Sequence, residues 1–253
     1  MIAAVQETRW QGFKIFDTGD YMVCYRGSNE HNLFGTGFMI HKRVKDHMLN
    51  FELVDECKCY LRLQGKFFNI TIICVHAPPP TENNDDIVKS SFYDRLDRVY
   101  DTIPKHDAVI IMGDTNTRVS KDPLTPCTGI CILHEISNDH GDRLCDFVTS
   151  RDLIISSNIF PHKNIHLQTW ISPDGLTAKQ IDHVMTSKRH AAYLTDIRSQ
   201  QGVDCDSDHF MMRIKYRLKI SILFKHPCTR HLRFDISKLQ DGTCVKEYHN
   251  SIK

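Results

Sequence analysis

The sequence lacks any apolar run of the roughly 18 residues that a helix needs to cross a lipid bilayer. Its first residues, MIAAVQETRW, carry no basic segment, and their apolar part is too short for a secretory signal peptide. These absences exclude a membrane helix within this sequence and predict a soluble, intracellular chain. The sequence also lacks an excess of either charge, because its net charge is only +1 at pH 7. A net charge this small argues against a broad basic surface for nucleic acid and leaves local basic groups for that purpose.

Internal repeats and low-complexity tracts are also absent, and the 253 residues fit one large domain or two small ones. The ten cysteines are scattered along the chain rather than concentrated in a small, loop-rich framework, which favours reduced thiols. Two pairs, Cys57-x-Cys59 and Cys127-x3-Cys131, match no common set of zinc ligands. Buried or loop thiols are therefore preferred over a structural zinc site.

The stretch VIIMGDTNTRV at 109–119 gives the first indication of chemistry. Its first four letters form a short apolar run with β-branched residues, which predicts a buried strand that ends at Gly113. Asp114 and Asn116 follow, and in open α/β sheets functional side chains gather at such carboxyl ends of strands. Taken alone the pattern is weak, because Asp and Asn also occur in ordinary turns through hydrogen bonds to their own backbone.

Ionisable side chains recur at the ends of other predicted strands. The full set comprises Glu7, His76, Asp114 with Asn116, Asp182, and Asp208 with His209. Buried carboxylates are costly unless they are paired or bound to metal, and carboxylates without thiolates suit Mg²⁺ or Mn²⁺ rather than zinc. A metal, an acid that orients water and a cationic histidine are what phosphodiester hydrolysis needs. For any single member, a solvated position after a strand is the ordinary alternative.

Alternating strands and helices predict a mixed α/β sandwich. A helix closed by a proline is indicated by residues at helical spacing: Phe92, Leu96, Val99 and Ile103, followed by Pro104. Residues 59–63 and 67–75 predict a hairpin around a tight turn, whereas 41–55 is polar and mixed. Beyond Ile222 the chain changes character, with prolines, basic residues and no sustained period.

Six short motifs stand in a characteristic order: QETRW at 6–10, HAPPP at 76–80, GDTNT at 113–117, TW at 169–170, QIDHV at 180–184 and SDH at 207–209. Their order and rough spacing resemble the endonuclease/exonuclease/phosphatase superfamily of DNase I and the apurinic endonucleases. QETRW, the proline run and QIDHV most resemble endonuclease domains of non-LTR retroelements, including the craniofacial development protein 2-like family. The resemblance covers about residues 1–219 and implies a four-layer α/β sandwich, with two packed mixed sheets flanked by helices.

The resemblance also divides the chain and marks one departure from the family. Residues 220–253 form a tail in which RFDISKL at 233–239 looks like the connector that precedes a reverse transcriptase in those elements. Family members begin with a strand whose Asn helps to hold the metal, whereas this chain starts at the strand of Glu7. The expectation is an N-terminally truncated domain, in which the sheet lacks a strand and both metal binding and stability are weakened.

For the hydrolytic step, the resemblance implies roles at the matching positions. Glu7 and Asp208 would serve a Mg²⁺ or Mn²⁺ ion. Asp114 would orient and activate the water, and Asn116 would hold that water or a phosphate oxygen. Because both residues belong to the GDTNT motif, this stretch carries the nucleophile side of the proposed chemistry.

Two histidines would serve the phosphate. Asp182 would pair with His209 and favour its charged form, and His209 would then contact the scissile phosphate. His76 would protonate the leaving oxygen or bind phosphate. His183, beside Asp182, is expected to point to the opposite face of its strand and to pack or face solvent. Substrate contacts are expected from Arg9, Thr169, Trp170 and Ser207, with core packing an equal alternative for Trp170.

Three functions compete on this basis. The leading hypothesis is a Mg²⁺-dependent endonuclease that nicks DNA, acts as a monomer in the nucleus and has no membrane partner. The second is a catalytically inactive nucleic-acid-binding or interaction remnant, which the departure at the N-terminal strand motivates. The third is a phosphatase for small phosphates, ranked lower because no additional basic pocket is evident near the motifs.

Overall fold

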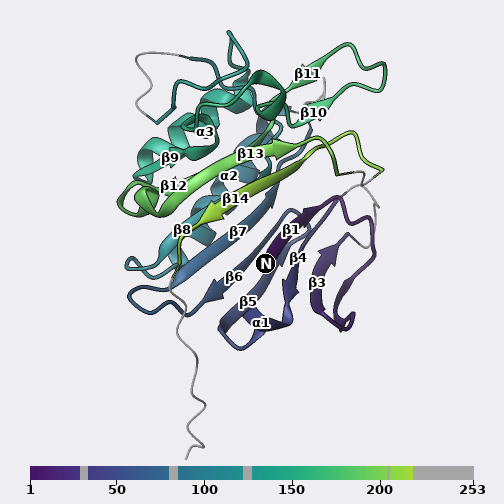
Figure 1. Ribbon diagram of the computed structural model, residues 1–253, viewed down its shortest axis with the longest axis vertical. Coiled ribbons are helices and arrows are strands. Elements are labelled where there is room, and N and C mark those ends of the chain that lie inside the picture. The colour runs from purple at the N-terminus through teal and green to yellow at the C-terminus, as the bar shows by residue number, and fades with distance from the viewer. Residues whose placement is uncertain (29–33, 80–84, 122–126, 204–205, 219–253) are drawn as a thin grey trace, which may run out of the picture. The chain divides into compact units, whose positions relative to one another are not determined.

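A computed structural model of the chain, shown in Figure 1, describes residues 1–28, 34–79, 85–121, 127–203 and 206–218. The predicted tail at 220–253 and the last proline of the HAPPP motif lie outside the described residues. All described residues belong to one of the two units of the chain, which spans Met1–Ile222. The described architecture is therefore that of this unit alone.

A six-stranded mixed sheet forms the centre of this unit. Its strands, in spatial order, are β5 (Met48–Asp55), β6 (Lys58–Leu63), β7 (Ile70–His76), β8 (Ala108–Asp114), β12 (Asp182–Ser187) and β9 (Leu153–Ile155). β7 and β8 run parallel, and the remaining neighbours in the sheet are antiparallel. The strand expected from the VIIM run is thus β8, and it lies in the interior of the sheet.

Two helices cover one face of this sheet, α2 (Asp85–Thr102) and α3 (Asp139–Ser150). The predicted helical stripe of α2, which includes Phe92 and Leu96, packs there against Ile73 and Ile111 of the sheet. Asn138 begins α3 by accepting a hydrogen bond from the backbone N–H of Gly141. Burial of each large aliphatic side chain in this layer stabilises the fold by about 1.5–3 kcal/mol.

A second layer of strands covers the other face. One sheet has the order β1 (Ile2–Gln6), β4 (Gly35–His41), β3 (Tyr21–Gly27) and β2 (Phe13–Asp17), and a separate pair joins β13 (Leu194–Gln200) to β14 (Met211–Tyr216). Both pack against the central sheet through one apolar cluster, in which Phe38 and Ile197 join Ile72 and Ile110. Among the described residues, β1 pairs with β4 alone. The predicted α/β sandwich of two packed sheets with helices is confirmed.

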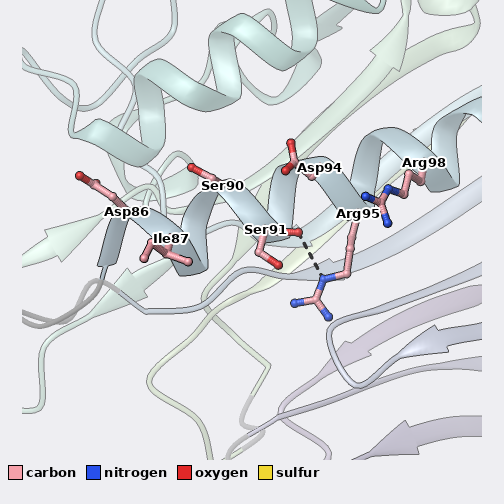
Figure 2. Close-up of a pocket in the computed structure, with 7 residues that line it drawn as sticks. All are labelled: Asp86, Ile87, Ser90, Ser91, Asp94, Arg95 and Arg98. Carbon is pink, nitrogen blue, oxygen red and sulfur yellow. Dashed lines mark hydrogen bonds between the residues drawn. The ribbon is translucent and has the colours of Figure 1, made fainter.

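Short elements complete the unit: α1 (Lys42–Lys45), the hairpin of β10 (Trp170–Ile171) and β11 (Ala178–Lys179), and the 3-10 helices η1 (Ser156–Asn158), η2 (Asn164–His166) and η3 (Lys188–Tyr193). None of the described helices is both long and apolar enough to cross a membrane. A hollow of about 650 Å³ lies along α2. Figure 2 draws the residues that line it, among them Asp94 and Arg95. The hollow contains no predicted site residue, because those residues lie at the strand ends.

Candidate active site

Three predicted site residues stand in a row across neighbouring strands of the central sheet. His76 ends β7 and is the register partner of Asp114, which ends β8. Asp114 is in turn the register partner of Asp182, which begins β12. Because β7 and β8 are parallel and β12 is antiparallel to β8, two strand ends and one strand start meet at the same edge. The arrangement brings together groups that are more than 100 positions apart in the chain.

Asp114 and Asn116 form a locked pair at this edge. Asp114 is buried, and its Oδ1 accepts a 2.9 Å hydrogen bond from the backbone N–H of Asn116. The Asn116 amide Nδ2 donates to the carbonyl of Ala77 at 2.9 Å and lies 3.3 Å from Asp114 Oδ2. Asn116 takes a left-handed backbone with φ 50°, a conformation that Asn tolerates better than most residues. The turn therefore holds the carboxylate and the amide in one fixed relation.

Asp182 and His209 form the second pair. The His209 Nδ1 lies 3.1 Å from Asp182 Oδ2, which leaves the Nε2 side of the ring for another partner. The backbone N–H groups of Ile181 and Asp182 donate to the buried hydroxyl of Thr169 at 2.9 and 3.0 Å, and this contact fixes the start of β12. Thr169, predicted as a substrate contact, thus supports Asp182 from within the fold.

Glu7 reaches the same edge from the second sheet, directly after β1. Its Oε1 lies 3.8 Å from His76 Nε2, and Asp114 Oδ2 lies 3.9 Å from the same nitrogen. Its other oxygen, Oε2, accepts a 2.8 Å hydrogen bond from Arg9. Glu7 and Arg9 both have positive φ, 48° and 53°, which is uncommon for residues without a short polar side chain. Backbone strain of this kind is concentrated at functional sites.

The remaining predicted residues lie beside this group, on the surface. Trp170 Nε1 donates to Asp208 Oδ2 at 2.7 Å, and the Lys179 ammonium sits 4.7 Å from the indole centroid. Ser207 accepts a hydrogen bond from the backbone N–H of His209 at 3.1 Å. Trp170 and Asp208, predicted for substrate and metal, are therefore partners of one another in this structure.

The charges at the edge are strongly interdependent. Burial, followed by the negative charge of Asp182, raises the pKa of Asp114 to about 8. Burial lowers the pKa of His209, but the hydrogen bond and charge of Asp182, with Asp114, outweigh burial and raise that pKa to about 9. Burial lowers the pKa of His76 despite the nearby charge of Glu7. At neutral pH the site therefore holds a charged His209 and a neutral His76.

The carboxylates at this edge are the available donors for a divalent metal. Within the described part of the chain, no group of three or more His, Cys, Asp or Glu side chains is arranged to hold a metal ion. Mg²⁺ does not require such a cage, because it keeps several waters and takes one or two protein carboxylates. Glu7 and Asp114 supply two carboxylates that approach the same His76 nitrogen, and the Glu7 side chain is 43% exposed to solvent. The oxygen donors therefore fit Mg²⁺ or Mn²⁺ in type and number.

Residues outside the predicted set of site residues hold this site in place. Thr115 and Thr117 alternate with Asp114 and Asn116, and their hydroxyl oxygens lie 2.7 Å apart, both buried. His183 is buried behind the site, on the face of β12 opposite Asp182, as predicted, and it contacts the carbonyl of Thr117. The alternation in D-T-N-T was the available signal, since alternate residues of an extended segment point to opposite sides.

Comparison with solved structures identifies the fold. The chain superposes on the Xenopus laevis APE2 catalytic domain with a TM-score of 0.66 at 14% identity, covering 88% of this chain and 85% of that one. The endonuclease domain of TRAS1, a telomere-specific non-LTR retrotransposon, gives 0.53 at 15% identity over 86% of each chain. The 3′ phosphatase NExo from Neisseria, bound to a product DNA hairpin, gives 0.60 at 15%, covering 85% and 88%. The fold is that of the DNase I-like endonuclease/exonuclease/phosphatase proteins.

In sequence, the chain is similar to craniofacial development protein 2. It is 32% identical over 224 residues to that protein of Tragulus javanicus, and 31% identical over 242 residues to that of Bos taurus. The alignments cover 88% and 96% of this chain but only 38% and 40% of the relatives, so the chain spans about two fifths of their length. No family model matches the sequence. The resemblance predicted from the six motifs is confirmed by these relatives and by the fold.

Proposed function

We propose that this chain is a Mg²⁺- or Mn²⁺-dependent phosphodiesterase, and specifically an endonuclease that nicks DNA. The observation that carries the proposal is the row of His76, Asp114 and Asp182, with His209 paired to Asp182. It combines a buried acid, a charged histidine and a neutral histidine at one edge. A nuclear location and a monomeric state accompany this proposal as expectations.

Asp114 is the group proposed to take a proton from the attacking water. With a pKa of about 8 the carboxyl is largely protonated at neutral pH, and a divalent cation bound beside it would lower that pKa and leave Asp114 ionised to act as the base. The amide Nδ2 of Asn116 donates to Ala77 and Asp114, so the proposed role of its Oδ1 is to accept a hydrogen bond from the attacking water and so orient it. These two residues supply the nucleophile.

The two histidines are proposed to act on the phosphate. Asp182 holds Nδ1 of His209 and keeps the ring charged, so that Nε2–H faces the extra negative charge of the transition state. Neutral His76 is buried beside both carboxylates, and its Nδ1 has no hydrogen-bond partner among the described residues. Its proposed role is to contact a phosphate oxygen or the leaving oxygen.

Glu7 would hold the metal beside Asp114, the other carboxylate at the same His76 nitrogen, and Asp208 is a further ligand expected from the sequence. When bound, the ion would offset charge on the phosphate and on the leaving oxygen. Binding of the metal by Glu7 would break its ion pair with Arg9. The two side chains of this pair are 43% and 67% exposed. Arg9 would then be available to the DNA backbone, together with Trp170 and Ser207 as substrate contacts.

Support for DNA as the substrate comes from the relatives. The TRAS1 domain is an endonuclease of a retrotransposon, and the Neisseria enzyme was captured with a DNA hairpin. Phosphate monoesters are the competing substrates, because the latter enzyme is a 3′ phosphatase. A direct comparison of the two substrate types separates these activities.

The test measures nicking of supercoiled plasmid with Mg²⁺ and after addition of EDTA. Nicking should require the metal and should fall below detection in Asp114→Asn, which keeps the shape of the side chain but cannot accept a proton. Asp94→Asn, an exposed acid on α2, is the matched control and should cut like the parent. A parent chain that cleaves only a soluble phosphomonoester would overturn the nuclease proposal, and one inert towards both would favour the binding remnant.

A further inference from the structure

His183 is a buried histidine immediately behind the candidate active site. It follows Asp182 on β12, and neighbouring residues of a strand point to opposite faces. Asp182 therefore faces His209, whereas His183 is only 1% exposed and faces the interior. None of the proposed chemical steps uses this ring.

Both ring nitrogens of His183 have polar contacts. Nε2 lies 3.2 Å from the carbonyl oxygen of Thr117, and Nδ1 lies 3.0 Å from the hydroxyl of Ser157. A carbonyl can only accept a hydrogen bond, so Nε2 must carry the proton. Burial lowers the pKa of His183 to about 4, which keeps the ring neutral at physiological pH. Nδ1 then accepts from the Ser157 hydroxyl, which lies closer to this nitrogen, at 3.0 Å, than to its other acceptor, Asn158 Oδ1 at 3.4 Å. One tautomer therefore satisfies both contacts of the ring.

The carbonyl that His183 holds belongs to the turn that presents Asn116. On one side of Asn116, the backbone N–H and the hydroxyl of Thr115 both donate to the carbonyl of Ile181, at 3.2 and 2.9 Å. On the other side, the carbonyl of Thr117 is fixed by His183. The turn is thus fastened at one end to Ile181, directly before β12, and at the other to His183 within β12, and Asn116 lies between the two contacts with its left-handed backbone.

We propose that His183 is a positioning residue that holds Asn116 in its working orientation by donating a hydrogen bond to the Thr117 carbonyl. This inference rests on the proposed function of Asn116, whereas the hydrogen bond between His183 and Thr117 is independent of that function. Thr117 is fully buried, so loss of the His183 donor leaves its carbonyl without a hydrogen bond, which is energetically unfavourable. The backbone at Thr117 is then expected to rotate towards another donor, and this rotation shifts the adjacent residue, Asn116.

Two variants of His183 separate the hydrogen bond from the packing. His183→Leu removes the donor while it keeps an apolar side chain of comparable size. His183→Gln retains an amide N–H close to the position of Nε2, so it should restore most of the activity. His190→Leu is the matched control, because His190 is also buried and bonds a serine, Ser187, at 3.1 Å.

The kinetic test measures plasmid nicking in these variants, with and without Asn116→Ala. His183→Leu should lower kcat about 10-fold with KM within about twofold, whereas His183→Gln and His190→Leu should stay close to the parent. In the Asn116→Ala background, His183→Leu should cost less than about twofold more, because it acts through a side chain already removed. A full additional 10-fold loss in that background would overturn the proposal.

Hydrogen exchange gives a readout that needs no activity. In His183→Leu, the amides of residues 115–118 should exchange at least about 10-fold faster than in His190→Leu. Unchanged exchange in these amides would refute the role of His183, even in an active enzyme. Faster exchange in a chain that cuts no DNA would support the contact and reject the nuclease function, so the two failures are distinguishable. If His183→Leu does not fold, Ser157→Ala removes the support of the same ring and takes its place.

Discussion

Asp182 with His209 and Glu7 with Arg9 are both acid–base pairs at the same edge, yet they are built differently. The first pair is partly buried, with side chains 13% and 27% exposed, and Thr169 supports it from within the fold. The second pair is 43% and 67% exposed and lies on strained backbone after β1, a strand with one described partner. A buried pair resists exchange of its partners, whereas an exposed pair is worth little and exchanges readily.

Because the two pairs differ in burial, we expect them to have different roles. The side of Asp182 and His209 is preorganised, because its geometry and protonation are fixed before any substrate arrives. The Glu7–Arg9 side is exchangeable, since the Glu7 carboxylate can leave an exposed arginine and bind a metal cation at a small cost in free energy. Variants on the two sides should therefore fail in different ways.

The largest effect is expected on the preorganised side, from Asp182→Asn. The carboxylate is lost, so His209 no longer has its charge partner, and nicking should fall by about 10³–10⁴-fold. The pKa of His209, about 9 in the parent, should drop by more than about one unit, since burial then acts without the opposing carboxylate. Plasmid nicking and an NMR titration of His209 measure the two results. An unchanged His209 pKa would show that Asp182 does not fix the protonation of His209, and the pair would then not be preorganised.

An intermediate effect is expected on the exchangeable side, from Glu7→Gln. The neutral amide is a poorer ligand for a hard cation, so nicking should fall about 100-fold at a fixed Mg²⁺ concentration. Unlike the loss in Asp182→Asn, this loss should be partly recovered by raising the concentration of Mg²⁺ or Mn²⁺. Equal recovery in both variants, measured over a metal titration, would show that the two sides do not differ.

The smallest effect is expected from Arg9→Ala. Removal of an exposed ion pair frees the Glu7 carboxylate, so the Mg²⁺ concentration for half-maximal nicking should fall by only about 1.5–5-fold. KM for DNA should rise at the same time if Arg9 contacts the backbone. Arg98→Ala on the exposed face of α2 serves as the control. An Arg9→Ala enzyme that needs more metal would contradict the exchange of partners.

Strand ends were the part of this site that the sequence could predict. Asp114, His76 and Asp182 each follow or begin an apolar run, and the parallel pairing of β7 and β8 turns that local property into proximity. The contact of Trp170 with Asp208 was not predictable, because it joins the two-residue strand β10 to a segment 38 positions further along the chain, and no sequence period connects them. The same holds for His183 and Ser157, whose partners depend on the assembled core.

The elements of the fold also differ in how well the sequence predicts them. The helix α2 was predicted from its apolar stripe and its closing proline, because that stripe faces a single layer. The strand β5 was hidden in a stretch that looked polar and mixed, since it lies at the edge of the sheet with part of its side chains in solvent. A half-exposed edge strand follows its neighbours more than its own composition.

The row of His76, Asp114 and Asp182 depends on register, and this makes the protein far more vulnerable to insertions than to substitutions. One extra residue in β8 would preserve the apolar character of the strand but would send the Asp114 carboxylate to the opposite face. Many neutral substitutions can accumulate in the layers above and below without disturbing the alignment. A decaying copy of such a gene would therefore lose its chemistry at the first length change in β7, β8 or β12, while it could still assemble much of the same sandwich.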